Sequence, residues 1–220
     1  MNINQTVMKP EMMKRIILTF TALLLITAVY AQNDKKARAI LDEVSAKTKT
    51  YKSIRIEFTY KMENTAQKIN ESYKGVLISK GDKYKLTFSG QEVMSDGKTV
   101  WTFVKDANEV QINDVSKDDD SFTPTNLLNT YNENYKARLI DETAKQKVIE
   151  LIPVQKKNFN KVRVSIETSR KMVSSLLIFD KNGSIYTYQV SKFETDLPYT
   201  DNSFVFRNAE HPGVEVVDMR

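Results

Sequence analysis

Residues 54–62 read Ile54-Arg55-Ile56-Glu57-Phe58-Thr59-Tyr60-Lys61-Met62, a strict alternation of apolar and polar side chains. Successive side chains of a β-strand point to opposite faces of a sheet, so a period of two predicts a strand with one buried face. Isoleucine, phenylalanine and tyrosine also favour strands intrinsically. The stretch therefore predicts a half-buried β-strand.

Similar alternation recurs through most of the chain beyond residue 53. Turn signals separate several of the runs, notably Gly81-Asp82, Asp96-Gly97 and Asn182-Gly183. Further strands are expected at residues 71–80, 83–88, 91–94, 99–105, 109–115, 135–141, 147–153, 161–167, 172–179 and 184–193. Short strands at this spacing predict a mainly β fold, a large antiparallel sheet that forms a barrel or an unclosed half-barrel.

A helix is expected before the first strand. Asn33 or Asp34 can cap it, and apolar residues recur at helical spacing from Ala37 to Val44, so the helix should run to about Thr50.

A second, short helix is expected inside the run of strands. Thr123 can cap it, with Pro124 at the first helical position, and Leu127, Leu128 and Tyr131 then share one side. An apolar side must pack against something, and the sheet is the nearest surface. The helix is therefore either a lid over the sheet or an ordinary connector.

Residues 1–31 have the features of a signal peptide. Lys14-Arg15 precedes a mostly apolar run of 14 residues, Ile16–Val29, and Val29 and Ala31 supply the small residues of a cleavage site. The run is shorter than the roughly 20 residues that span a bilayer, although a membrane anchor is the alternative. We expect an exported protein whose mature domain covers residues 32–220, with a true start at Met1 or Met13.

The composition excludes many kinds of site. The chain has no cysteine, which removes disulfides, thiolate metal sites, cysteine nucleophiles and acylation of this chain as a lipoprotein. It has one histidine, His211, in a His211-Pro212-Gly213 stretch that predicts a turn. Asp118-Asp119-Asp120 lacks the glycine and the distal glutamate of a calcium loop. We expect no catalytic residues, no metal and no cofactor, and hence no enzyme.

The net charge of +5 raises the question of nucleic acid, but the basic residues do not cluster. Arg55 and Lys61 alternate with Glu57 and Glu63, which is typical of a solvated surface. No nucleic-acid partner is predicted, and we expect a monomer.

One motif carries a resemblance to a known family. Ser95-Asp96-Gly97-Lys98-Thr99-Val100-Trp101-Thr102-Phe103 resembles the turn and following strand of LolA, the periplasmic carrier of outer-membrane lipoproteins. Phe58 in the first strand, the Thr123-Pro124 helix and the ending Phe204-Val205-Phe206 with Pro212–Val216 are similar to family features in the same order. The resemblance covers essentially the whole mature chain.

This resemblance implies an incomplete antiparallel barrel, closed by helices over an apolar cavity. It also implies periplasmic transport of acylated lipoproteins from an inner-membrane ABC-type release complex to an outer-membrane lipoprotein acceptor. Candidates for the acyl-chain cavity are Phe58, Tyr60, Leu86, Phe88, Trp101 and Phe103, then Ile166, Leu177 and Tyr188, with Leu127, Leu128 and Tyr131 on the lid. Each strand residue is alternatively ordinary core, because a period of two does not say which face is concave.

The sequence departs from the family at one position. The family carries an arginine just before the third strand that holds the lid closed, whereas this chain has Ser79-Lys80-Gly81-Asp82-Lys83-Tyr84. Lys80 or Lys83 can approach a lid, but an ammonium lacks the planar fork of a guanidinium. The departure leaves a second hypothesis open, a periplasmic lipid-binding or sensing module of the same fold that delivers no lipoprotein.

Overall fold

The computed structural model describes residues 34–115 and 131–220. The predicted signal peptide, the Asp118–Asp120 turn and most of the predicted lid helix, including Leu127 and Leu128, lie outside these residues. An N-terminal helix covers residues 34–48, and residues 131–134 are also helical. The described part of the chain contains no helix long and apolar enough to cross a bilayer.

Twelve strands of the described ranges form one sheet in the order β12-β6-β5-β4-β3-β2-β1-β11-β10-β9-β8-β7. The strands are β1 (Ile54–Asn64), β2 (Ile69–Lys80), β3 (Lys83–Phe88), β4 (Gln91–Ser95), β5 (Thr99–Val104), β6 (Glu109–Asp114), β7 (Tyr135–Glu142), β8 (Gln146–Pro153), β9 (Phe159–Glu167), β10 (Met172–Asp180), β11 (Ile185–Thr195) and β12 (Glu215–Asp218). All neighbours are antiparallel except β12 and β6, which run parallel. The predicted mainly β, unclosed antiparallel sheet with an N-terminal helix is confirmed, and β12 is an addition that the sequence pattern did not predict.

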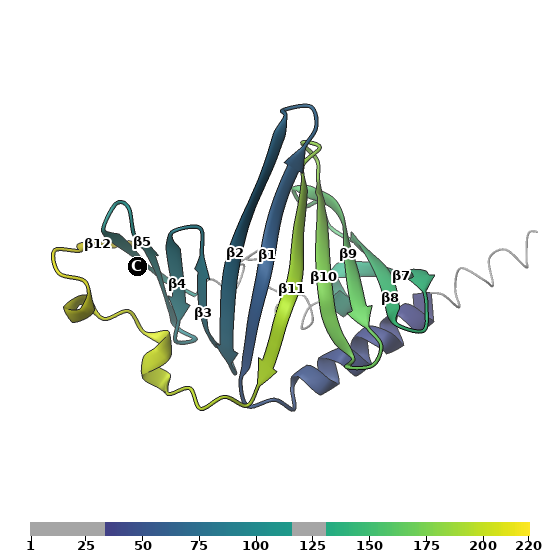
Figure 1. The fold of residues 1–220 in the computed structure, drawn as a ribbon, viewed down its shortest axis with the longest axis horizontal. Helices are drawn as coiled ribbons and strands as arrows, with labels where there is room; N and C mark the ends of the chain where they lie inside the picture. Colours follow the sequence, from purple (N-terminus) through teal and green to yellow (C-terminus); the bar gives the residue numbers. More distant parts are fainter. Residues whose placement is uncertain (1–33, 116–130) are drawn as a thin grey trace, which may run out of the picture.

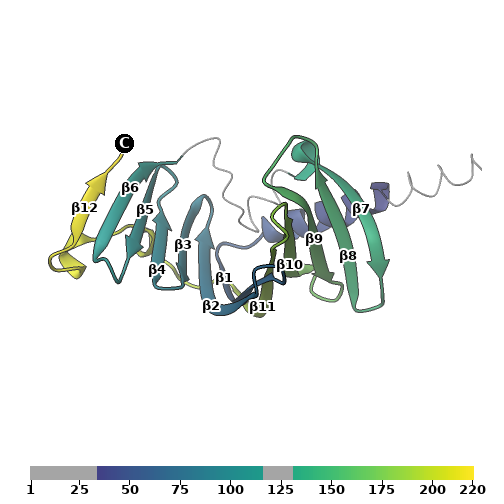
Figure 2. The ribbon, with the colours of Figure 1, turned by 90° about the horizontal axis from the view of Figure 1, so that it is seen from above.

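The sheet is strongly curved. Figure 2 shows both flanks, β12 to β5 on one side and β9 to β7 on the other, turned to the same side of the central strands β1 and β2. The N-terminal helix crosses the half of the sheet formed by β7–β11 (Figure 1). We call the face that the helix contacts the helix-bearing face.

The main core lies between this helix and the sheet. Ala37, Ile40, Leu41 and Val44 form the predicted apolar stripe of the helix, and all four are buried. They pack against alternate residues of four strands: Ala137 and Leu139 of β7, Ile149 and Leu151 of β8, Val162, Val164 and Ile166 of β9, and Leu176 and Ile178 of β10. The core therefore covers only one half of the helix-bearing face.

The chain after β11 forms a second layer on the other face. Residues 196–214, here called the strap, run from the centre of the sheet to its β6 edge and contain two 3-10 turns, Asp201–Phe204 and Asn208–Glu210. Phe206 of the strap packs with Met94, Phe103 and Val110, and Trp101 joins them at the edge of the cluster. This small second core ties β4–β6 to the strap.

Candidate functional site

Six aromatic rings gather on the helix-bearing face, beside the part that the helix covers. Tyr60 contacts four of them: its ring centroid lies 5.0 Å from Phe88, 5.2 Å from Tyr188, 6.2 Å from Tyr186 and 6.4 Å from Tyr73. Phe58 lies 5.8 Å from Tyr188 and 6.3 Å from Phe88. We call this set the ring cluster: Phe58, Tyr60, Tyr73, Phe88, Tyr186 and Tyr188.

Strand register explains why residues so far apart in sequence meet here. Tyr60 pairs with Tyr73 of β2 and with Tyr188 of β11, and directly opposed residues of antiparallel strands point to the same face. Phe58 is opposite Gly75, which is itself opposite Phe88. The missing side chain at Gly75 lets the rings of Phe58 and Phe88 approach across β2.

The same face continues with aliphatic residues toward the other end of β1. Ile56 pairs with Leu77, Leu77 with Leu86, and Leu86 with Val93. The ring cluster and this aliphatic row form one apolar surface across β1–β4 and β11, on which Tyr60, Leu86, Phe88, Tyr186 and Tyr188 are only half-buried. The structure thus brings together five predicted residues: Phe58, Tyr60, Leu86, Phe88 and Tyr188.

The structure places three other predicted residues on the opposite face, which corrects their assignment to a common cavity. Trp101 is opposite Met94, and Phe103 is opposite Glu92, in a register that turns both away from Leu86 and Phe88. Leu177 pairs with Thr187 and Arg163, also on the opposite face. The physical reason is that a period of two defines two faces without saying which of them is concave.

Ile166 lies on the helix-bearing face but within the main core. Its side chain is 2% exposed among residues that pack on the N-terminal helix. It therefore stabilises the fold and does not line the open half of the face.

Tyr131, predicted on the lid, is an anchor in the main core. It is 2% exposed, and its hydroxyl donates a hydrogen bond to Asp42 Oδ1 of the N-terminal helix. Burial and the nearby Asp42 carboxylate raise the pKa of Tyr131 to about 12, so the hydroxyl stays a donor at neutral pH. The end of the predicted lid segment is thus fixed to the N-terminal helix, while Leu127 and Leu128 lie outside the described residues.

The two lysines at the position of the family arginine point away from the helix-bearing face. Lys83 Nζ lies 2.6 Å from Asp201 Oδ2, and Lys80 Nζ lies 3.1 Å from Asp201 Oδ1 and 3.1 Å from the Tyr199 carbonyl oxygen. These ion pairs lower the pKa of Asp201, chiefly through the Lys83 hydrogen bond. Both lysines hold the strap, so neither serves as a latch over the ring cluster.

The motif at residues 95–99 closes the β4–β5 hairpin. Asp96 Oδ1 accepts hydrogen bonds from the Thr99 backbone N–H at 2.8 Å and the Lys98 N–H at 2.9 Å, which lower the pKa of the carboxyl group. Gly97 has φ +92°, a conformation that disfavours other residues. This motif is structural and contributes no group to the ring cluster.

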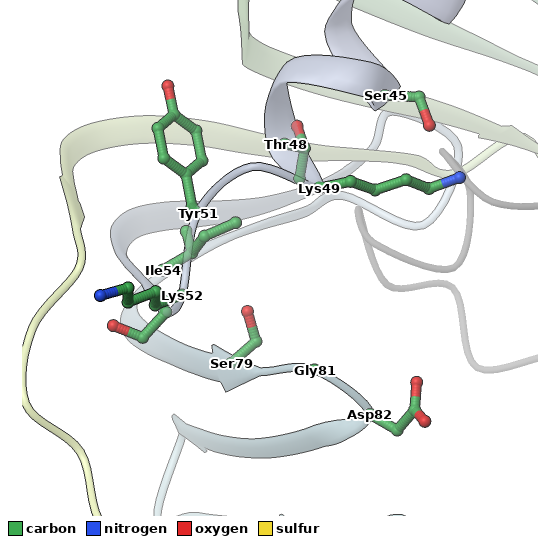
Figure 3. A pocket seen from close by; sticks show the side chains of 10 residues that line it. Ser45, Thr48, Lys49, Tyr51, Lys52, Ile54, Ser79, Gly81 and Asp82 are labelled. Carbon is green, nitrogen blue, oxygen red and sulfur yellow. The ribbon is translucent and has the colours of Figure 1, made fainter.

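A pocket of about 260 Å³ lies at the foot of the N-terminal helix, next to the start of β1 and the β2–β3 turn (Figure 3). Its lining is Ser45, Thr48, Lys49, Tyr51, Lys52, Ser53, Ile54, Ser79, Gly81 and Asp82. Most of these groups are hydroxyls or charged, and Figure 3 shows Ser79 pointing toward the helix end. Such a lining does not suit an acyl chain, although the pocket adjoins the apolar surface at Ile54.

A second pocket of about 320 Å³ lies between β2–β4 and the strap on the opposite face. Charged Lys85, Glu92, Arg207 and Glu210 are among its lining residues. His211 contributes its ring, whose centroid lies 4.4 Å from that of Phe103 and 4.5 Å from that of Phe206. The histidine is thus part of an aromatic stack that fixes the strap. Within residues 34–115 and 131–220, no group of three or more acidic or histidine side chains is placed to hold a metal ion.

Sequence reasoning missed three residues of this surface: Tyr73, Gly75 and Tyr186. The alternation of residues 71–80 and 184–193 contains both tyrosines, but only the register shows that they flank Tyr60. A glycine inside a strand signals close approach of another group, and this signal was present in the sequence at position 75.

A family model for the outer membrane lipoprotein carrier protein LolA matches residues 49–207. The match spans β1–β11 and every residue of the ring cluster. The chain belongs to the LolA family. LolA-family proteins are non-enzymatic carriers of the periplasm.

The chain is similar to several solved structures at low sequence identity. An uncharacterized conserved protein from Thermus thermophilus is 13% identical and has a TM-score of 0.58 over 83% of this chain and 99% of its own. A LolA superfamily protein from Nitrosomonas europaea is 12% identical, with a TM-score of 0.44 over 77% of this chain and 97% of its own. A putative outer membrane lipoprotein-sorting protein domain from Vibrio parahaemolyticus is 14% identical, with a TM-score of 0.45 over 78% and 97%. No functionally curated protein matches the sequence.

Proposed function

We propose that this LolA-family chain carries acylated lipoproteins through the periplasm and shields their acyl chains on the apolar surface of β1–β4 and β11. The observation that carries the proposal is the ring cluster with its aliphatic continuation, which is apolar, contiguous and only half-buried. Family membership supports a lipoprotein client.

The size of the surface suits an acyl chain. From Ile54 to Tyr60 the first strand advances six residues, roughly 20 Å at about 3.3 Å per residue. One acyl layer of a bilayer is about 15 Å thick, half of a hydrocarbon core of roughly 30 Å. A chain lying along β1 therefore stays in contact with apolar groups over its whole length.

Transport requires an intermediate affinity. Each CH₂ taken out of water is worth about 0.8 kcal/mol, so acyl chains strongly prefer any membrane to water. A partly open surface binds less tightly than an enclosed core, because part of the chain keeps its contact with water. This permits both uptake from a release complex in the inner membrane and transfer to an acceptor in the outer membrane.

The expectation that Leu127 and Leu128 cover this surface remains part of the proposal. Leu127→Glu should then reduce cargo retention with little loss of fold stability, since a carboxylate cannot pack on the rings without a desolvation cost. Equal cargo retention by Leu127→Glu and the parent protein would remove the lid role.

A release assay tests the proposed function. Purified residues 32–220 are added to spheroplasts of the source organism, and the supernatant is analysed for triacylated lipoproteins bound one-to-one to the protein. ATP-dependent release that requires the protein is the expected result. Phe88→Ala serves as the impaired variant, and Trp101→Ala, on the opposite face, serves as the matched control.

One observation favours a second candidate, a periplasmic lipid-binding or sensing module. The lysines at the position of the family arginine, Lys80 and Lys83, form ion pairs with Asp201. Within the described residues, the arginine that holds the lid in the family therefore has no counterpart at this position. The same assay separates the two candidates: free lipid that co-purifies in native mass spectrometry, without lipoprotein release, supports the module.

A further inference from the structure

Within the described residues, three tyrosine hydroxyls of the ring cluster have no hydrogen-bond partner. Tyr60, Tyr186 and Tyr188 engage other groups through their rings, but among the residues that the structure describes none accepts from or donates to their hydroxyls. These hydroxyls are not among the side-chain atoms buried without a partner, so water can reach them in the free protein. A ligand that covers them displaces this water, and that loss is unfavourable unless a hydrogen bond to the ligand replaces it.

Other tyrosines of the helix-bearing face satisfy this requirement internally. The Tyr131 hydroxyl donates to Asp42, and the Tyr73 hydroxyl donates to Glu71 Oε2 at 3.1 Å. Phenylalanine occupies two equivalent places in the ring cluster, Phe58 and Phe88, so ring packing alone does not require a hydroxyl. The other three hydroxyls are therefore better suited to an acceptor that arrives with the ligand.

We propose that Tyr60, Tyr186 and Tyr188 recognise the ester or amide carbonyl groups that join acyl chains to a lipid, and so select acylated ligands over plain hydrocarbon. This inference rests on the proposed function and names the polar chemistry of its ligand. The three side chains come from adjacent strands: Tyr188 is directly opposite Tyr60, and Tyr186 lies two residues before Tyr188 on the same face. The rings of Tyr186 and Tyr188 accordingly lie next to that of Tyr60, with centroids 6.2 and 5.2 Å from it.

Two of these hydroxyls are held firmly in the protonated, donating form. Burial raises the pKa of Tyr60 to about 12, with smaller contributions from Tyr188 and Tyr186, and burial also raises the pKa of Tyr188. A neutral phenol donates one hydrogen bond to a carbonyl oxygen. An ether oxygen in the same place is a poorer acceptor, which provides the basis for a test.

The test compares two lipids that differ only in this group. Binding of 1-palmitoyl lysophosphatidylglycerol and of its 1-O-hexadecyl ether analogue is measured by isothermal titration calorimetry, below their micellar concentrations. Wild-type protein should prefer the ester. One net hydrogen bond corresponds to about two- to tenfold in affinity, so a preference in that range or above is expected.

Tyr60→Phe, Tyr186→Phe, Tyr188→Phe and the triple variant keep the rings and remove the hydroxyls. The triple variant should bind the ether lipid as wild type does and lose the ester preference. Tyr199→Phe is the matched control, because Tyr199 lies on the strap, where its ring packs with Phe204 outside the ring cluster, and the variant should leave the ratio unchanged.

Two outcomes separate this inference from the proposed function. If wild type binds both lipids equally, or the triple variant keeps the ester preference, the hydroxyl inference is wrong while lipid binding stands. If wild type binds neither lipid and releases no lipoprotein, both the proposed function and this inference are wrong. Urea unfolding of the triple variant verifies that the rings remain packed.

Discussion

The ring of Phe58 on β1 occupies the space above Gly75 on β2 that any side chain at position 75 would need. An ideal Cβ on Gly75 would lie 2.8 Å from Phe58 Cε2 and 2.9 Å from Cε1, closer than Cβ atoms approach neighbours. Gly75 does not have the positive φ of the turn glycines. It is required by close approach, and that approach joins Phe58 to Phe88 in the ring cluster.

Gly75→Ala should therefore displace the Phe58 ring. Overpacking of this kind costs about 1–3 kcal/mol, measured as the free energy of unfolding in urea. Phe58→Leu in the Gly75→Ala background should recover part of the loss, since the smaller side chain leaves room. Unchanged stability in Gly75→Ala, or simple additivity in the double variant, would contradict the contact.

Phe88→Ala and Trp101→Ala should show that the two faces of the sheet have different roles, one in binding and the other in stability. Phe88→Ala removes a half-exposed ring from the apolar surface and should weaken binding of a fluorescent fatty acid roughly tenfold. Trp101→Ala should destabilise the fold by about 2 kcal/mol, because Trp101 packs beside Met94, Phe103 and Phe206, and should leave binding unchanged. If Trp101→Ala weakens fatty-acid binding by more than its loss of folded protein explains, the binding site lies on the face that carries Trp101 and the proposed surface is wrong.

Asp96 should make the unfolding free energy fall at low pH. Its carboxylate accepts the Thr99 and Lys98 N–H groups, which lower its pKa in the folded protein relative to the usual value of about 3.9. A lowered folded pKa contributes stability that is present above about pH 4 and is lost as the pH falls through the folded pKa.

Asp96→Asn keeps an acceptor oxygen at the turn but removes the titrating group. It should flatten this part of the pH dependence when urea unfolding is followed from about pH 6 to about pH 3. Asp96→Ala should lower stability by about 1.5–3 kcal/mol near neutral pH without affecting lipid binding. If the unfolding free energy of Asp96→Asn depends on pH as that of wild type does, the Asp96 carboxylate is not the source of the pH dependence.

Lys80→Met and Lys83→Met should loosen the strap and spare the ring cluster. Removing both ammonium groups leaves Asp201 without its two ion pairs, so the bonds around residues 199–207 should be cleaved faster in limited proteolysis. Fatty-acid binding should stay within about twofold of wild type, because both lysines lie on the opposite face. A large loss of binding with unchanged proteolysis would instead support a latch role for these lysines.

Tyr131→Phe should destabilise the attachment of the 131–134 helical turn. The variant removes only the hydroxyl that donates to Asp42, and loss of one such bond costs about 1 kcal/mol. Urea unfolding gives the difference, with Tyr73→Phe as a variant at an exposed hydroxyl. If Tyr131→Phe and Tyr73→Phe unfold alike, the bond to Asp42 contributes no measurable stability.

The order of elements followed directly from local sequence. Alternation from Ile54 to Met62 predicts β1, the Asn182-Gly183 turn predicts the β10–β11 hairpin, and the apolar stripe from Ala37 to Val44 predicts the helix. Each of these signals depends on neighbours within a few residues. Strand β12 gave no such signal, because its four residues are held by parallel pairing to β6, about a hundred residues earlier in the chain.

The site depended on contacts that no local pattern contains. The period of two correctly sorted Phe58 and Tyr60 from Arg55 and Lys61, but it could not tell that Phe103 packs on the strap while Phe88 faces the rings. Register, curvature and the path of residues 196–214 decide this, and all three arise from long-range pairing. Local sequence thus determined which residues alternate and where the chain turns. The tertiary structure alone decided which face carries the half-buried rings, because a strand has two equivalent faces until something packs on one of them.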